Sequence, residues 1–298
     1  MIGTGPDRRH SAAIDDRDRR GRGSPALRRD GDLDPFTRAR LERIAEDALR
    51  AAGVWGRLPT PLEDVQRAAG IRARRDIAEL PAALVERPAR PLLGALWFEP
   101  REVFVDLSQP APRRRFTDAH EAMHALCPWH EAALLQDTEA ELSHDAKEAI
   151  EAEANFGAGL LIFQGRRFAD RIADAPADMA TVAELAAEHG ASRQATLHHF
   201  AQHHTRPIAL LSIGRFPQRD GRLPVWRTVA SPAFRRRFGR LGADLGPGRP
   251  LRELVEAARR FAAPCGTRLE LADGSGTVRR WTAEAHYNRR AFLVLVAG

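Results

Sequence analysis

The sequence predicts an α+β protein in which a mainly helical part with a small β-sheet precedes a C-terminal α/β module. Apolar residues recur at helical spacing through much of the first two hundred residues, whereas short apolar runs bounded by turn signals, typical of strands, occur near residues 94–107 and again after 265. The charged residues are also unevenly distributed between the two parts of the sequence. Residues 206–298 hold 18 Arg against 7 acidic residues, and residues 1–205 carry a net charge of −5. This asymmetry favours two functional parts.

Composition narrows the class of protein. The chain has 298 residues and a formal charge of +6, but Lys147 is its only lysine. Such an arginine excess resembles a coding bias, so the basic total is weak evidence for nucleic-acid binding. No apolar stretch is long enough to span a bilayer, and the N-terminus has no apolar signal core. Two cysteines make no disulfide framework, so we expect a cytoplasmic protein.

The first elements follow a charged N-terminal segment. Residues 1–32 mix charges with Gly and few large apolar groups, which predicts a disordered tail. Structure is expected to begin near Asp34, with a helix through Leu41–Leu49 that ends at Gly53. A second, short helix is predicted over 61–69.

A β-hairpin and a helix come next. The runs Gly94–Phe98 and Val103–Leu107 predict two strands, and the prolines that follow should end them. A helix is expected to start at Thr117, a good N-cap residue, and to end before Pro128.

The remaining elements include a third long helix over Lys147–Phe163. A helix-turn-helix pattern follows at 181–204, with helices Thr181–His189 and Arg193–His203, the second capped by Ser192. After it the sequence predicts a helix at Leu251–Phe261 and strands at 267–271, 278–282 and 292–296, the first two joined by a turn at Asp273-Gly274.

One short motif carries metal chemistry. Residues 120–124 read His-Glu-Ala-Met-His, an HExxH pentapeptide. On a helix, positions i and i+4 share one face, so His120 and His124 can bind the same ion. The intervening Glu121 would then lie beside the water that such an ion activates. We therefore expect His120 and His124 to be metal ligands and Glu121 to be catalytic.

A catalytic zinc needs a third protein ligand and an open position. Glu151 is the best candidate, because the apolar stripe of its helix follows it at Ala154, Ala158 and Leu161. Glu153 lies about 200° further around the helix and should face elsewhere. Glu148, one turn earlier, is the fallback ligand.

These residues carry a family resemblance. The segment Arg115–His124, followed by Glu151 and by Ala154-Asn155, resembles the ImmA/IrrE family of bacterial metallo-endopeptidases, and the strand pair before it looks like the family's own. The resemblance covers about residues 38–204. It implies a zincin-like fold, a Zn²⁺ ion, and cleavage or regulation of a transcriptional repressor. Some relatives carry a helix-turn-helix and a C-terminal sensor-like domain. Together with the division of charge, this leads us to expect a metallopeptidase domain at 33–205, which includes the helix-turn-helix-like segment, and a basic C-terminal domain at 206–298.

The chain departs from the family pattern at three places. Met123 stands where the family commonly has Gly, Gly157 stands where an aromatic is common, and Phe163-Gln164 replaces a usual Met-Pro. None of these differences removes an expected metal ligand. They affect the packing around the site and the groove for the substrate.

The expected function is that of a regulatory zinc-dependent endopeptidase, with a helix-turn-helix repressor as a possible protein substrate. Zinc would acidify its bound water, and Glu121 would accept the proton and deliver it to the leaving amine. A peptide could add to the exposed edge of the hairpin. His130, His144 and Tyr287 are candidate oxyanion stabilisers, and no membrane partner is expected.

The alternative is a DNA-binding transcriptional regulator with a structural or vestigial metal site. In the helix-turn-helix, the second helix has only Arg193 as a cation, although Gln194 could read a base, and this favours a structural role. The run Arg235–Arg237 is a better footprint for an acidic partner. A third hypothesis is that the C-terminal module senses a small ligand and gates the peptidase.

Overall fold

The computed structural model describes residues 12–13, 33–80, 92–136, 144–239, 241, 249–261 and 265–298. It confirms an α+β fold with two sheets. The chain forms two compact units, one mainly from residues 33–165 and the other mainly from 166–188 and 192–298. The boundary expected at 205/206 stays a prediction. The tail expected at 1–32 lies outside the described residues, except Ala12 and Ala13. Among the described helices, none has the length and apolarity needed to cross a membrane.

The first unit begins with two of the predicted helices. Helix α1 (Pro35–Ala51) starts where Asp34 accepts hydrogen bonds from the backbone N–H groups of the first turn, and it buries the apolar stripe that includes Leu41 and Leu49. Helix α2 (Leu62–Ala68) is short and buries Val65. Both helices pack near α3 (Ala111–Leu126), the helix that carries the HExxH motif.

The sheet of the first unit has the order β1-β3-β4-β2. Its centre is the expected hairpin of β3 (Gly94–Phe98) and β4 (Arg101–Val105), in which Leu96 pairs with Val103. The hairpin edges are partly covered, because β3 has an outer partner at Ala95 and Leu96 and β4 has one at residues 102–105. The backbone of β1 (Ala12–Ala13) pairs antiparallel with β3, and β2 (Ala73–Asp76) pairs parallel with β4. Neither β2 nor the following 3₁₀ turn η1 (Ile77–Glu79) was expected from the sequence.

The motif helix α3 (Ala111–Leu126) starts six residues before the predicted Thr117. The prediction treated Pro110 and Pro112 only as strand terminators, but proline fits the first turn of a helix, where its missing N–H is not needed. Thr117 is therefore not an N-cap: its hydroxyl donates to the carbonyl of Arg113 one turn earlier. Pro128 begins a further helix, α4 (Pro128–Gln136).

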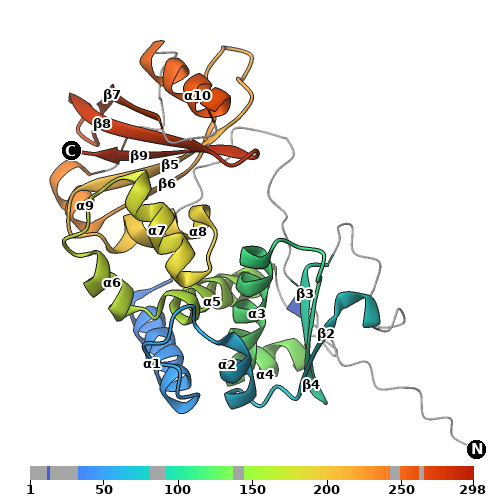
Figure 1. Ribbon diagram of the computed structural model, residues 1–298. Coiled ribbons are helices and arrows are strands. Elements are labelled where there is room, and N and C mark those ends of the chain that lie inside the picture. The colour runs from blue at the N-terminus through green and yellow to red at the C-terminus, as the bar shows by residue number, and fades with distance from the viewer. Residues whose placement is uncertain are drawn as a thin grey trace, which may run out of the picture. The chain divides into compact units, whose positions relative to one another are not determined.

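Helix α5 (His144–Phe163) matches the third long helix of the prediction. Helix α3 packs along α5 and also against β3 and β4, so it lies between the helices and the sheet of the first unit (Figure 1). Its residues 117–124 are all buried. The HExxH motif is thus held in the interior of this unit.

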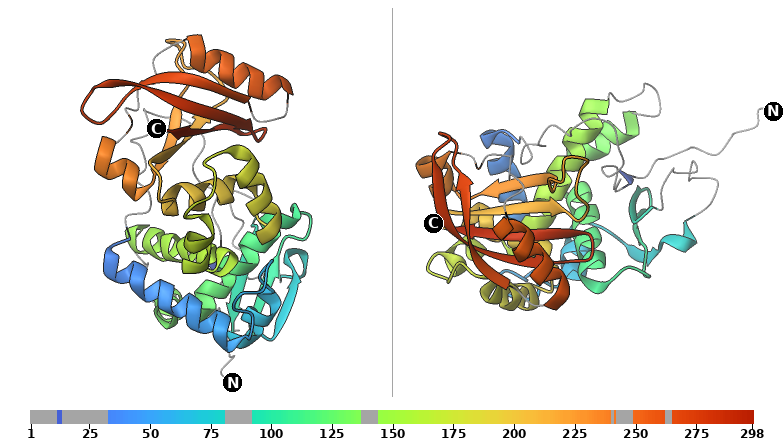
Figure 2. Two further views of the ribbon diagram at one scale, coloured as in Figure 1. Left: turned by 60° about the vertical axis from the view of Figure 1, so that its left-hand side comes forward. Right: turned by 90° about the horizontal axis from the view of Figure 1, so that it is seen from above.

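The second unit contains a five-stranded antiparallel sheet of order β6-β5-β9-β8-β7. The last three strands match the prediction, whereas β5 and β6 were not expected. The bounds are β5 (Ile208–Gly214), β6 (Val225–Ala230), β7 (Cys265–Ala272), β8 (Val278–Tyr287) and β9 (Ala291–Ala297). Helix α10 (Arg249–Phe261) lies on one face of this sheet and α8 (Arg193–His203) on the opposite face (Figure 2). Buried Trp281 packs against Phe234 and Phe238 of α9 (Pro232–Phe238).

Three helices precede this sheet in the second unit: α6 (Arg166–Ile172), α7 (Met179–His189) and α8 (Arg193–His203). The last two are the predicted helix-turn-helix, and Ser192 caps α8 as expected. Helix α8 packs against α6, β5 and β6, and only Arg193 in it is exposed. Gln194 accepts a hydrogen bond from Asn288. A recognition helix needs a free face for the major groove, so this geometry favours the structural role.

Candidate metal centre

Polar contacts hold α3 in place before the motif begins. Arg74 of β2 makes a bidentate ion pair with Asp118, with its Nε 2.7 Å and its second nitrogen 3.1 Å from the two carboxylate oxygens. Gln66 of α2 donates to the carbonyl oxygen and the carboxylate of the same residue. Asp118 thus has hydrogen-bond partners on two separate elements, and these bonds hold the start of the motif against both α2 and the sheet.

Close packing brings α3 and α5 together. A Cβ atom built at Gly157 of α5 would lie 2.4–2.8 Å from three atoms of the Met123 side chain, which is fully buried. Met123 therefore fills the space that a side chain at position 157 would need. The two positions are complementary in size: the large residue is on α3 and the small one is on α5.

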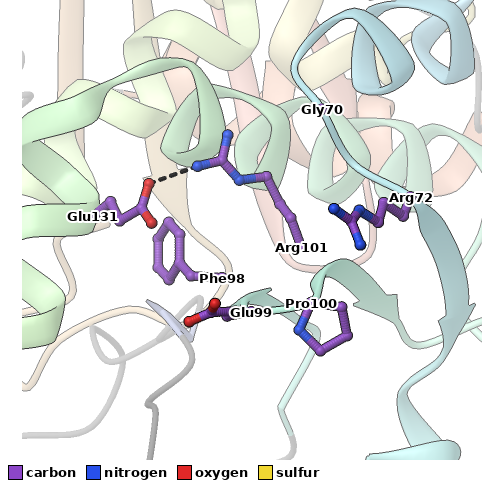
Figure 3. A pocket seen from close by; sticks show the side chains of 7 residues that line it. All are labelled: Gly70, Arg72, Phe98, Glu99, Pro100, Arg101 and Glu131. Atoms are coloured by element: carbon purple, nitrogen blue, oxygen red, sulfur yellow. Dashed lines mark hydrogen bonds and ion pairs between the residues drawn. The ribbon is translucent and has the colours of Figure 1, made fainter.

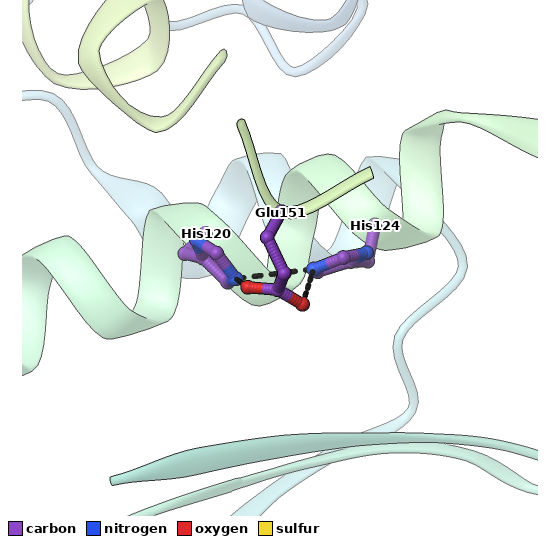
Figure 4. Close-up of side chains that lie close together, drawn as sticks. All are labelled: His120, His124 and Glu151. Carbon is purple, nitrogen blue, oxygen red and sulfur yellow. Dashed lines mark hydrogen bonds and ion pairs between the residues drawn. The ribbon is translucent and has the colours of Figure 1, made fainter. Parts of the chain in front are cut away.

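The two motif histidines meet Glu151 at this helix pair (Figure 4). The Nε2 atoms of His120 and His124 are 3.0 Å apart, and they lie 3.3 and 3.6 Å from the carboxylate oxygens of Glu151. Both histidines are fully buried, while the Glu151 side chain is 28% exposed. Among the residues that the structure describes, this is the group of His, Cys and acidic side chains that could hold a metal ion.

The donor set fits a divalent metal such as zinc. Ligand atoms about 2.0–2.2 Å from one ion in tetrahedral geometry lie about 3.3–3.6 Å apart, close to the separations seen here. Burial lowers the pKa of His124 to about 4, so its ring is neutral near neutral pH. Burial also acts to raise the pKa of Glu151, but hydrogen bonds with His120 and His124 outweigh it and lower this pKa to about 2. Neutral imidazole and ionised carboxylate are the forms that bind metal.

Glu121 lies beside this group with its carboxylate unsatisfied. Its side chain is fully buried, and neither carboxylate oxygen has a hydrogen-bond partner among the described residues. Burial raises its pKa well above the usual value, and the charges of Glu151 and Asp118 raise it further. A Cβ at Gly94 of β3 would lie 2.8 Å from one of these oxygens, so β3 passes directly over the carboxylate. Such a buried, unpaired carboxylate is costly unless a cation or water accompanies it.

The other two acidic residues of α5 lie elsewhere. Glu148, the fallback ligand, is exposed and is not a member of the group. Glu153 faces a different neighbour, as its position on the helix predicts: it is 3.1 Å from Nε2 of His130 and accepts a hydrogen bond from Trp129. The sequence reasoning missed this pairing, since only the fold places α4 against α5.

The described structure assigns none of the three candidate oxyanion stabilisers to this group. His130 hydrogen-bonds to Nδ1 of His124, on the opposite side of the ring from Nε2. The side chain of His144 lies outside the described residues. Tyr287 belongs to the second unit, where its hydroxyl donates to the carbonyl of Arg289. The oxyanion stabiliser therefore stays unassigned.

A surface pocket at the hairpin turn is distinct from the metal centre (Figure 3). It is lined by residues that include Phe98, Arg72 and Arg101, and by none of the metal group. Arg101 donates to Glu131 of α4 at 2.6 Å and to the carbonyl oxygens of Ala69 and Ala125. These bonds connect β4 to α3, to α4 and to the C-cap residue of α2, which gives the arginine a structural role.

A family model matches the part of the chain that carries this site. Residues 87–201, which include the HExxH motif and α5, match the Peptidase_M78 family model, described as the IrrE N-terminal-like domain. This match confirms the resemblance to the ImmA/IrrE family over that stretch and associates it with a metallopeptidase family. No curated protein matches the chain.

A solved structure has a similar fold. It is described as a "Mycobacterium tuberculosis transcriptional regulator" and is similar with a TM-score of 0.52 and 16% identity. The similarity covers 87% of this chain and 75% of the other. At this level of identity the likeness concerns the fold alone.

Proposed function

We propose that this protein is a zinc-dependent endopeptidase of regulatory type that cleaves a protein substrate in the cytoplasm. The observation that carries the proposal is the convergence of two buried histidines and the carboxylate of Glu151 beside the buried, unpaired carboxylate of Glu121. A structural zinc site is normally closed by four protein ligands, whereas three ligands leave a position open for chemistry. The described part of the chain supplies three.

His120, His124 and Glu151 would hold the ion. A zinc ion bound there would lower the pKa of water to about 7 and polarise the substrate carbonyl. Positive charge beside Glu121 favours the ionised form of its carboxyl, which burial alone opposes. Glu121 then accepts the proton of the attacking water and delivers it to the leaving amine. Gly94 lets β3 approach this carboxylate and keeps bulk water away from it.

The substrate is proposed to bind as an extended strand along β3. This strand passes over Glu121, and its outer edge already accepts one antiparallel partner through the backbone of Ala12 and Ala13. A substrate peptide would take the place of this two-residue pairing. The expected substrate is a DNA-binding transcriptional repressor, an extension that rests on the family resemblance.

The decisive experiment is cleavage of a co-expressed repressor by the variant Glu121→Gln. This variant should keep zinc and lose activity by about 10²–10⁴-fold, the usual contribution of a general base. Glu148→Gln is the matched control, because it removes an exposed carboxylate of α5 outside the metal group. Normal cleavage by Glu121→Gln would refute the mechanism. DNA binding that depends on Arg235–Arg237, with no cleavage by the wild type, would instead support the alternative regulator.

A further inference from the structure

A buried chain of hydrogen bonds leads away from the candidate metal centre. Nδ1 of His124 is 3.1 Å from Nδ1 of His130, and Nε2 of His130 is 3.1 Å from the carboxylate of Glu153. The three residues come from α3, α4 and α5. Both histidines are fully buried, and the Glu153 side chain is only 16% exposed. The chain thus connects one metal-ligand candidate to a carboxylate outside the group.

The direction of each hydrogen bond follows from the metal centre. An imidazole that binds a metal through Nε2 must carry its proton on Nδ1. Nδ1 of His124 is therefore the donor to His130, whose Nδ1 accepts. The proton of neutral His130 then lies on its Nε2, which donates to Glu153. Each nitrogen and the carboxylate oxygen has a partner of the correct kind, so a single arrangement of protons satisfies the whole chain.

Glu153 is itself held in position. The indole Nε1 of Trp129 donates to the same carboxylate oxygen at 2.7 Å. The guanidinium of Arg40 in α1 lies over the Trp129 ring, with its central carbon 3.5 Å from the ring centroid. A carboxylate fixed in this way is less free to turn to another rotamer, so it remains a hydrogen-bond acceptor for His130.

We propose that His130 and Glu153 are positioning residues that orient the His124 ring and hold its Nε2 lone pair toward the metal. The inference rests on the proposed metal centre and adds how the protein orients one of the proposed ligands. Only His124 has this support: Nδ1 of His120 is buried without a hydrogen-bond partner among the described residues. Neither His130 nor Glu153 is a ligand, since neither belongs to the metal group.

The test measures zinc affinity by chelator competition and the visible absorption spectrum of the Co²⁺-substituted protein. His130→Phe keeps an aromatic ring but interrupts the series of hydrogen bonds. Glu153→Leu removes the carboxylate at the end of that series. Each should weaken zinc binding by about 10–100-fold and change the Co²⁺ spectrum. Glu153→Gln keeps an oxygen acceptor for His130 and should recover much of the affinity. His189→Phe is the matched control, because His189 is a buried histidine that bonds to the carbonyl of Ile162.

The outcomes separate the inference from the proposed function. The inference is wrong if His130→Phe and Glu153→Leu both bind zinc within twofold of the wild type and leave the Co²⁺ spectrum unchanged. It is also wrong if the control His189→Phe weakens zinc binding as much as they do, since the effect would then be general loss of packing. If His130→Phe does not fold, the comparison of Glu153→Leu with Glu153→Gln decides the question. Wild-type protein that binds no zinc would contradict the proposed function itself.

Discussion

The contact between Met123 and Gly157 allows a quantitative test of how α3 and α5 are held together. The perturbation is Gly157→Ala, alone and combined with Met123→Ala. In the interior of a helix, replacing Gly by Ala gains about 0.8–1.0 kcal/mol of stability. The added Cβ, however, would lie 2.4–2.8 Å from three Met123 atoms, including Cγ near the backbone, so the neighbour must move. Overpacking of this kind costs about 1–3 kcal/mol.

These terms give opposite signs in the two backgrounds. With Met123 present, Gly157→Ala should destabilise the protein by about 0–2 kcal/mol. Met123→Ala alone should cost about 2–5 kcal/mol, because a fully buried side chain is lost. In that background Gly157→Ala should stabilise by about 1 kcal/mol, since the clash is absent. The coupling energy between the two positions is therefore expected to be about 1–3 kcal/mol.

The assay is urea denaturation of metal-free protein, followed by hydrogen exchange in peptides from α3 and α5. Removing metal with a chelator keeps ligand binding from adding to the stability of some variants. Peptide resolution reports on the first unit separately from the second. If Gly157→Ala stabilises the protein by about 1 kcal/mol in both backgrounds, the two side chains do not compete for space. The complementary packing of Met123 and Gly157 would then be refuted.

Three further predictions follow from the structure. In the metal-free protein the His124 imidazole should titrate near pH 4 instead of 6.5. Its contribution to the free energy of unfolding is therefore present above pH 6.5 and is lost as the pH falls to about 4. An imidazole that titrates near pH 6.5 by NMR would contradict this. The thiol of Cys127 is buried and burial raises its pKa to about 12, so a thiol reagent at pH 8 should label half-buried Cys265 first, and equal rates would count against the fold. Asp118→Asn should destabilise the first unit by about 1–3 kcal/mol through its charged bonds with Arg74, and a change under 0.5 kcal/mol in urea denaturation would show that the pair contributes little.

Local signals in the sequence predicted several elements correctly. The capping residues Asp34 and Ser192 mark helix starts where the structure has them, because a cap depends on the residue itself and on the next turn. The turn at Asp273 also forms as expected, and its side chain accepts backbone N–H groups from residues 275 and 277. These features need no contact with distant parts of the chain.

Other elements were missed because their signals are ambiguous. Strand β5 is buried along its whole length and lies between β6 and β9, so its residues do not alternate between apolar and polar. Such a continuous apolar run cannot be assigned by periodicity alone. The start of α3 was misplaced for a related reason: proline ends a strand or begins a helix, and only the surrounding structure decides between them.

The sequence by itself determined which residues could carry the chemistry. Two histidines four residues apart on a helix share a face whatever the rest of the fold is. The position of the glutamate between them on that helix is fixed in the same way. Tertiary structure decided what surrounds them: that Glu151 reaches both rings, that β3 passes over Glu121, and that His130 and Glu153 support His124. The physical reason is that helical periodicity is a property of neighbouring residues, whereas contacts between α3, α4, α5 and β3 depend on how their side chains pack.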